Sequence, residues 1–145
     1  MAQRMREWKF ATTKTWTNWR AILVEQHIDP PSPKMNLVEI QGASAPLDLT
    51  DWDGSVYYSP REISCRLFLG DDVGDSTAQY ARLKEIVAAV HGQTMRIRDA
   101  DDTDNYFRGR CQVTDIERHQ WGIYLTIKAT CHPWRYDSNG NEVRT

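Results

Sequence analysis

The chain has 145 residues, of which 40% are hydrophobic and 26% are charged, and its formal net charge is −2 at pH 7. These proportions are typical of a folded domain and exclude a disordered or low-complexity chain. The slight negative charge argues against a nucleic-acid binder, which needs an excess of Lys and Arg to hold phosphates. No run of apolar residues approaches the roughly 18 of a membrane span, and none follows the basic N-terminus as in a signal peptide. We therefore expect a protein that is made in the cytoplasm and has no membrane partner.

The first strand signals lie on either side of a proline-rich segment. Residues 19–26 and 34–40 are short apolar runs rich in branched side chains, which favours strands. Between them, the sequence DPPSP (29–33) stops the first run and stiffens the connection. An irregular stretch follows, so residues 28–60 are expected to form an extended arm.

The middle of the chain predicts one strand and one helix. Residues 61–69 alternate between apolar and polar side chains, as in a half-buried strand. Residues 76–91 place apolar side chains on one helical stripe, with Ser76 and Gln79 at capping-box spacing and Gly92 as the stop. This helix is expected to pack one face on a sheet.

The C-terminal half predicts a hairpin and a long strand. Residues 94–98 and 106–113 flank an acidic turn, and residues 121–131 alternate over eleven positions with Trp121 in the buried set. One helix inserted between groups of strands indicates a mainly β, α+β fold, a β-sandwich-like domain with one helix. We expect a single domain over residues 1–136, a flexible tail over 137–145, and no second C-terminal domain.

No constellation of residues predicts an enzyme, a cofactor or a metal. The acidic turn at residues 99–104 lacks the glycine and the bidentate glutamate of a calcium loop, so we interpret it as a solvated turn, with calcium as the lesser alternative. The three cysteines fall on apolar faces of strands, which favours buried, reduced thiols over zinc ligands; they are Cys65, Cys111 and Cys131. A catalytic Cys–His pair would need a flanking pattern that the chain lacks.

Six tryptophans stand out, because aromatic residues near turns and termini often form interfaces. Five of them lie in such places: Trp8, Trp16, Trp19, Trp52 and Trp134. Trp52 lies beside Tyr57 and Tyr58 in the arm, where we favour a contact between subunits over an intrachain lid. An arm that cannot bury its apolar side chains needs a partner.

Four segments resemble, in order and spacing, the N-terminal ring domain of the siphophage distal tail protein family (Dit). They are IDPPSPKMNLVEIQGASAPLDLT (28–50), GSVYYSPREISCRLFL (54–69), NYFRGR (105–110) and LTIKATCHPWRY (125–136). The segment TTKTWTNWRAILVE (12–25) resembles the first strand of the family. The likeness therefore covers residues 12–136. Many members of the family continue past the equivalent of HPWRY into a second domain.

The resemblance implies a virion structural protein of a siphophage or prophage, made in the bacterial host cytoplasm and located at the tail tip. Six copies would form a ring that joins the tail-tube protein to the tail-associated hub protein of the baseplate. The centre of the ring would be the path for DNA and the tape-measure protein. The arm would be the element between subunits, with these contacts: Leu47, Leu49, Trp52, Tyr57 and Tyr58.

Three alternatives stay open. A major tail-tube protein would share the sandwich, the helix and the ring symmetry but would stack into long tubes. A small carbohydrate-binding module would use Trp52, Tyr57 and Tyr58 as a stacking platform. An enzyme would need a concave polar site, for which the sequence supplies no set of residues.

Overall fold

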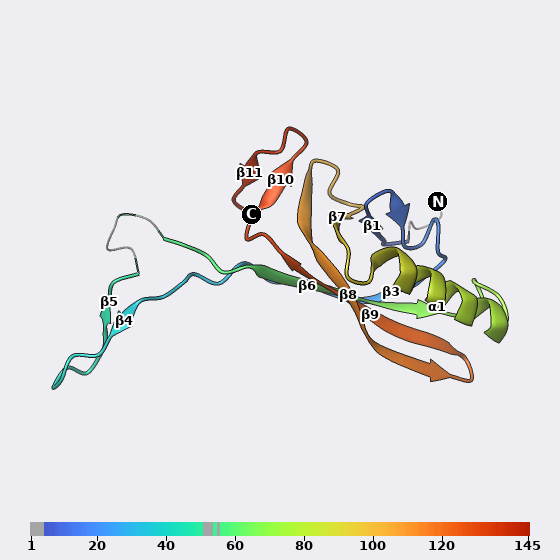
Figure 1. Ribbon diagram of the computed structural model, residues 1–145, viewed down its shortest axis with the longest axis horizontal. Coiled ribbons are helices and arrows are strands. Elements are labelled where there is room, and N and C mark those ends of the chain that lie inside the picture. Colours follow the sequence, from blue (N-terminus) through green and yellow to red (C-terminus); the bar gives the residue numbers. More distant parts are fainter. Residues whose placement is uncertain (1–4, 51–53, 55) are drawn as a thin grey trace.

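The computed structural model describes residues 5–50, 54 and 56–145. The described part is mainly β with a single helix, which confirms the fold class predicted from the sequence. Figure 1 shows a body made of a curved sheet and the helix, from which the arm projects to one side. Within the described residues no helix has the length and apolar character needed to cross a membrane.

The body is built on one antiparallel sheet with the strand order β2-β1-β7-β8-β9-β6-β3. A short hairpin, β10 with β11, attaches to the start of β8. The strands of this sheet are β1 (Trp8–Phe10), β2 (Thr13–Lys14), β3 (Ile22–Ile28), β6 (Arg61–Leu69), β7 (Thr94–Asp99), β8 (Asn105–His119), β9 (Gly122–Cys131), β10 (Arg135–Asp137) and β11 (Glu142–Val143).

The sheet curls until its two ends approach each other. Trp8 Nε1 on β1 donates a hydrogen bond to Gln26 Oε1 on β3 at 2.7 Å, although the two strands lie far apart in the strand order. Between the two halves of the sheet, Ile63 on β6 and Ile97 on β7 are each 1% exposed. The result is a sandwich-like body with a continuous core.

The helix α1 (Ser76–Val90) packs Leu83, Ile86 and Val90 into that core. Its N-cap differs from the predicted capping box: the side chain of Asp75, not Ser76, accepts a hydrogen bond from the backbone N–H of Ala78 at 2.9 Å. The helix thus begins one residue after an aspartate that satisfies one of its free amides.

Two tryptophan predictions are wrong in opposite directions. Trp121, expected in the core, is 61% exposed, because His119 pairs with Gly122 and leaves Trp121 in the tight turn between β8 and β9. Trp8 and Trp19, expected at an interface, are 1% and 2% exposed. Trp8 is buried because β1 pairs with β7 and becomes one wall of the core, and Trp19 is buried against the ring of Phe10 on β1, with ring centroids 6.2 Å apart.

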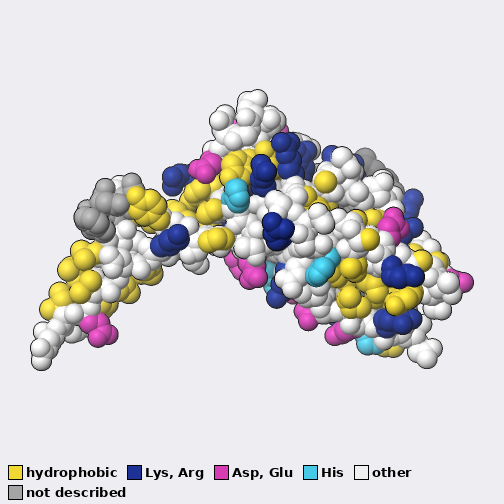
Figure 2. Space-filling view, viewed as in Figure 1, with side chains coloured by type: hydrophobic (Ala, Val, Ile, Leu, Met, Phe, Trp, Pro, Cys, Tyr) yellow, Lys and Arg dark blue, Asp and Glu magenta, His cyan; other side chains and the backbone are white. Residues whose placement is uncertain are grey.

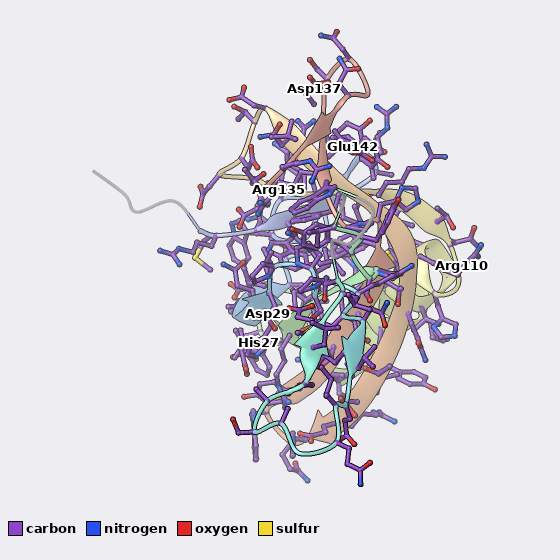
Figure 3. The ribbon with its side chains drawn as sticks, turned by 90° about the vertical axis from the view of Figure 1, so that its left-hand side faces the viewer. His27, Asp29, Arg110, Arg135, Asp137 and Glu142 are labelled. Carbon is purple, nitrogen blue, oxygen red and sulfur yellow. The ribbon has the colours of Figure 1, made fainter. Side chains whose placement is uncertain are left out.

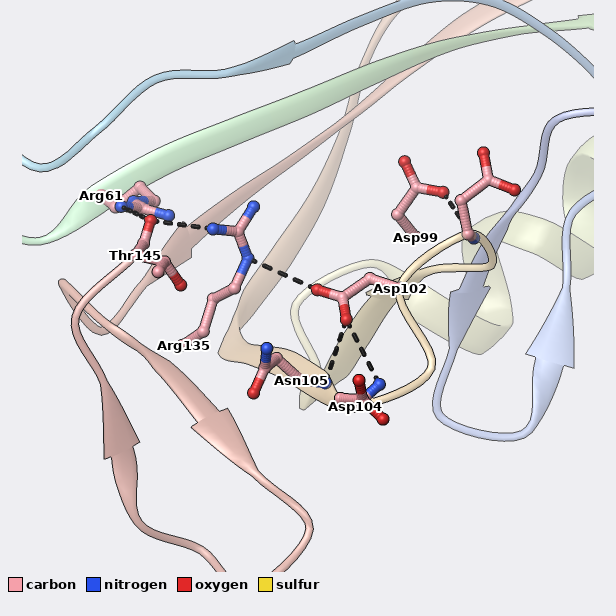
Figure 4. Close-up of polar contacts among 8 residues, drawn as sticks. Arg61, Asp99, Asp102, Asp104, Asn105, Arg135 and Thr145 are labelled. Carbon is pink, nitrogen blue, oxygen red and sulfur yellow. Dashed lines mark hydrogen bonds and ion pairs between the residues drawn. The ribbon is translucent and has the colours of Figure 1, made fainter.

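Residues 135–143 form the β10–β11 hairpin, and the flexibility expected of residues 137–145 stays a prediction. The carbonyl oxygen of Thr145 accepts hydrogen bonds from Arg61 at 2.9 Å and from Arg135 at 2.8 Å (Figure 4). The C-terminal segment therefore returns to the body beside the start of β6.

Candidate functional site

The extended arm predicted over residues 28–60 is present (Figure 1), and the described residues of its two sides pair with each other as a ribbon. It leaves the body between β3 and β6, which are neighbours in the sheet. Its two sides are joined near the root by the backbone bonds Lys34 N–H to Tyr57 O at 2.6 Å and Ser59 N–H to Ser32 O at 2.8 Å. Farther out, β4 (Leu37–Val38) pairs with β5 (Leu47–Asp48).

An isolated two-stranded ribbon is at best marginally stable in water, because it has no second layer against which to bury side chains. The apolar side chains of this arm are accordingly exposed: 61% for Met35, 49% for both Leu37 and Ile40, and 46% for Leu47. Figure 2 shows hydrophobic side chains along the length of the arm. A monomer rarely exposes so continuous an apolar surface unless it binds a partner there.

The five predicted contact residues divide into three groups. Leu47 is exposed, and Tyr57 is 56% exposed; Leu49 and Tyr58 are half-buried. Trp52 lies outside the described residues. None of these positions has been seen in contact with a second copy, so their role at an interface stays a prediction.

Sequence reasoning missed the other side of the ribbon. Met35, Leu37, Val38 and Ile40 belong to the run 34–40, which we assigned to a strand without considering which partner it pairs with. The run does form a short strand, but it pairs within the arm and not with the main sheet. The apolar composition of residues 34–40 was the feature of the sequence that could have indicated a contact surface on this side of the arm.

The root of the arm rests on the C-terminal segment. The rings of Tyr58 and Trp134 meet edge to face with centroids 4.7 Å apart, and the Arg144 guanidinium lies 5.2 Å from the Trp134 ring centroid. Arg61 is 2% exposed and lies over Phe107. Burial, and secondly the neighbouring charge of Arg135, lower the pKa of Arg61 from its ordinary value. These contacts orient the arm relative to the body.

The charged side chains around the arm root do not converge on one point. Viewed from the arm side in Figure 3, His27 and Asp29 lie where β3 runs into the arm, Asp137 and Glu142 lie on the C-terminal hairpin, and Arg110 lies to the right beside the helix. In the part of the chain that the structure describes, no three His, Cys, Asp or Glu side chains group as metal ligands would.

The acidic turn between β7 and β8 uses its carboxylates locally. Asp99 Oδ1 accepts from the Asp101 N–H at 3.0 Å, and Asp102 Oδ1 accepts from the N–H groups of Asp104 and Asn105 at 3.2 and 3.1 Å (Figure 4). Asp102 also forms an ion pair with Arg135 at 3.8 Å. These bonds are those of a turn stabilised by aspartates.

The three cysteines are free and buried, as predicted. Burial raises the pKa of Cys111 to about 11 and that of Cys131 to about 12, and it also raises the pKa of Cys65. The thiols are therefore protonated near neutral pH, whereas a nucleophilic cysteine acts as a thiolate. They serve as small apolar side chains in the core.

Comparison with known proteins gives a likeness in structure. No family model matches the chain, and no curated protein matches it in sequence. A solved structure does match: the crystal structure of the SPP1 Dit (gp 19.1) protein, described as a paradigm of the hub adsorption apparatus in phages that infect Gram-positive bacteria. The TM-score is 0.70 over 92% of this chain, with 16% sequence identity. The match spans 52% of the SPP1 chain, so this chain shares the fold of about half of that protein.

Proposed function

We propose that this chain is a structural protein of a siphophage or prophage tail tip, equivalent to the ring domain of a distal tail protein. Six copies close into a ring that joins the tail tube to the tail hub and leaves a channel for DNA and the tape-measure protein. The shared fold with SPP1 Dit supports this proposal, and so does the resemblance of the five sequence segments.

The observation that carries the proposal is the arm. A ribbon of exposed apolar side chains projects from the body, and no described residue forms a second layer over it. A contact in which a projecting element of one copy enters a different surface of the next produces a closed ring when it is head-to-tail and the rotation between copies closes, whereas a reciprocal exchange of arms produces a two-fold dimer. The arm is thus suited to assembly between copies, and the resemblance to the distal tail protein family favours the ring over a two-fold dimer.

The alternatives make different use of the same surface. The carbohydrate-binding module requires open aromatic faces at Tyr57 and Tyr58, but Tyr58 is half-buried against Trp134. A tail-tube protein would use the arm between copies as well, but its rings would stack. An enzyme would need an activated nucleophile or a convergent polar site, and the buried thiols are protonated.

Electron microscopy of the purified protein, with light scattering over a concentration series, tests the proposal. Single rings with a central hole are expected. Filaments would replace the proposal with the tail-tube function, and a monomer that binds glycans would replace it with the carbohydrate-binding module.

A shortened variant provides the control for the arm. Because Ile28 and Ile63 are paired neighbours on β3 and β6, a short turn in place of residues 30–59 can join the two strands directly. This variant is expected to fold and to stay monomeric. Rings formed by the shortened variant would remove the arm from the proposal.

A further inference from the structure

A second surface with exposed aromatic and basic side chains lies at the end of the body formed by α1 and the β8–β9 hairpin. We name it the hairpin–helix patch and define it by Tyr80, Lys84, Ile116, Arg118 and Trp121. Tyr80 is 42% exposed, Ile116 47% and Trp121 61%. Figure 2 shows basic side chains among hydrophobic ones over this end of the body.

Two cations of the patch share one aromatic ring. The Arg118 guanidinium lies 4.5 Å from the centroid of the Tyr80 ring, and the Lys84 ammonium lies 5.3 Å from it. A ring face attracts a cation, so Tyr80 holds both charges in one place. Neither Lys84 nor Arg118 forms an ion pair with any residue that the structure describes.

The carboxylates next to these cations in the sequence, Glu85 and Glu117, are paired with other side chains. Glu117 pairs with Arg66 at 3.1 Å and lies 3.4 Å from the His119 ring, and Glu85 pairs with Arg82 at 3.1 Å. Among the described residues, no carboxylate forms an ion pair with the two cations of the patch. An acidic partner would complete it.

Trp121 adds a flat apolar element to the same surface. Its ring stacks on His119 with centroids 4.5 Å apart and an angle of 3° between the planes. A shallow hollow at the hairpin tip is lined by Arg118, His119, Gln120 and Trp121 together with Ser76 at the start of α1. Aromatic rings beside arginine are the side chains most often found at the energetic centre of an interface.

The arm has the complementary character. Residues 28–60 contain five acidic residues and one lysine, which gives a net charge of −4 beside the exposed apolar side chains. Glu39 and Asp48 are both exposed, and a hydrogen bond from Thr50 lowers the pKa of Asp48, so its carboxylate stays ionised. The arm thus offers apolar contact and negative charge together.

The arm and the patch lie at opposite ends of the molecule, as the positions of β4–β5 and of the β8–β9 hairpin in Figure 1 show. Two complementary surfaces at opposite ends cannot meet within one chain, but they can meet between successive copies of a ring. We infer that the acidic, apolar arm of one copy docks on the basic, aromatic hairpin–helix patch of the next. This inference rests on the proposed ring and names the surface that receives the arm.

Zero-length carbodiimide cross-linking of the wild-type chain tests the contact directly. The reagent joins a carboxylate to an amine only when the two are in contact, so the inference predicts links from Glu39 or Asp48 to Lys84. An equal mixture of 14N- and 15N-labelled protein, analysed by mass spectrometry, identifies links between chains because their peptide pairs carry mixed labels.

Charge reversal provides the second measurement. Lys84→Glu with Arg118→Glu in the patch, or Glu39→Lys with Asp48→Lys in the arm, is expected to raise the protein concentration needed for half assembly at least tenfold. The two reversals combined in one chain are expected to restore assembly. Arg108→Glu is the matched control, because this exposed arginine lies ten residues before Arg118 on β8, roughly 33 Å away at about 3.3 Å per residue.

The outcomes separate the inference from the proposed ring. Rings with links from the arm to lysines other than Lys84, or equal assembly of every variant, would overturn the inference and leave the ring in place. Mixed-label links to Lys84 in a chain that never closes into rings would support the inference and overturn the ring. A monomer without such links would overturn both.

Discussion

The exposed leucines of the arm should matter for assembly and very little for the stability of the folded body. We take the double substitution Leu37→Ser with Leu47→Ser, whose side chains expose 49% and 46% of their surface and lie on β4 and β5. The comparison variant is Leu125→Ala, at a position that is fully buried in the central strand β9.

The magnitudes follow from these exposures. Complete burial of a leucine side chain stabilises by roughly 1.5–3 kcal/mol. Because each arm leucine still exposes about half of its surface, its burial at an interface can contribute about half of that free energy. The double substitution should therefore weaken each contact between copies by about 2 kcal/mol, which is roughly a 25-fold rise in its dissociation constant. The core substitution Leu125→Ala should lower the free energy of unfolding by about 2–5 kcal/mol.

Two measurements separate the effects. Light scattering over a concentration series gives the concentration of half assembly, and denaturant unfolding of dilute protein gives the stability of the body. The double variant is expected to raise the concentration of half assembly strongly. Its free energy of unfolding is expected to change by less than about 0.5 kcal/mol, as usual for surface positions. Normal assembly of the double variant, or a loss of body stability comparable with that of Leu125→Ala, would refute the reasoning.

Four further predictions concern the body. Gly109→Ala should lower the free energy of unfolding by about 1–3 kcal/mol, because a Cβ there would lie 2.5 Å from the carbonyl oxygen of Thr130. Gln112→Ala, at an exposed position on the same strand, is the control and should change the free energy of unfolding little in the same denaturant titration. Asp75→Ala should lower the free energy of unfolding by about 0.5–2 kcal/mol, and Ser76→Ala should lower it much less. A larger loss of thermal stability for Ser76→Ala than for Asp75→Ala would indicate that Ser76 caps the helix, as the sequence predicted. The buried thiols should resist alkylation at pH 8 until the chain unfolds, and rapid labelling of the folded protein would contradict their burial. Because their pKa values are raised, the stability that the neutral thiols contribute is complete below pH 9.0, the ordinary value, and is lost as the pH rises toward about 12, which a series of unfolding curves over that range can measure.

Periodicity predicted the elements that face a core. Residues 61–69 form a strand as expected, and the strand predicted over residues 121–131 is present over 122–131, because alternation of apolar side chains reports directly which face of a strand is buried. The helix also begins where the sequence placed it. Its cap was misassigned because Asp75 and Ser76 are both good capping residues and only the backbone geometry selects between them.

Pairing partners could not be predicted from these patterns. The run at residues 34–40 has the composition of a sheet strand, yet it pairs within the arm. Pro33 separates it from β3, and the chain reversal near Gly42 brings the other side of the arm beside it. Trp121 fits the alternation of the following strand, but a two-residue turn removes it from that strand. Trp8 lies near the N-terminus of the sequence, which suggested an exposed position, but it is buried in the core. Its burial depends on the long-range pairing of β1 with β7, which local patterns do not report.

The hairpin–helix patch could not be predicted from the sequence for the same reason. Tyr80 and Arg118 are separated by 38 positions, and only the fold brings their side chains together. Nothing in the local sequence around either residue distinguishes it from a solvated surface residue. The apolar arm, by contrast, was predicted because its composition and its prolines are local features.

Native mass spectrometry of the wild-type chain tests the central claim, closure into a ring, most directly. Six copies of the 16.8 kDa chain have a mass of about 101 kDa, and a closed ring keeps that mass as the protein concentration rises. The account predicts one dominant species at that mass together with monomer. A ladder of masses that lengthens with concentration, or monomer alone at every concentration, would contradict it.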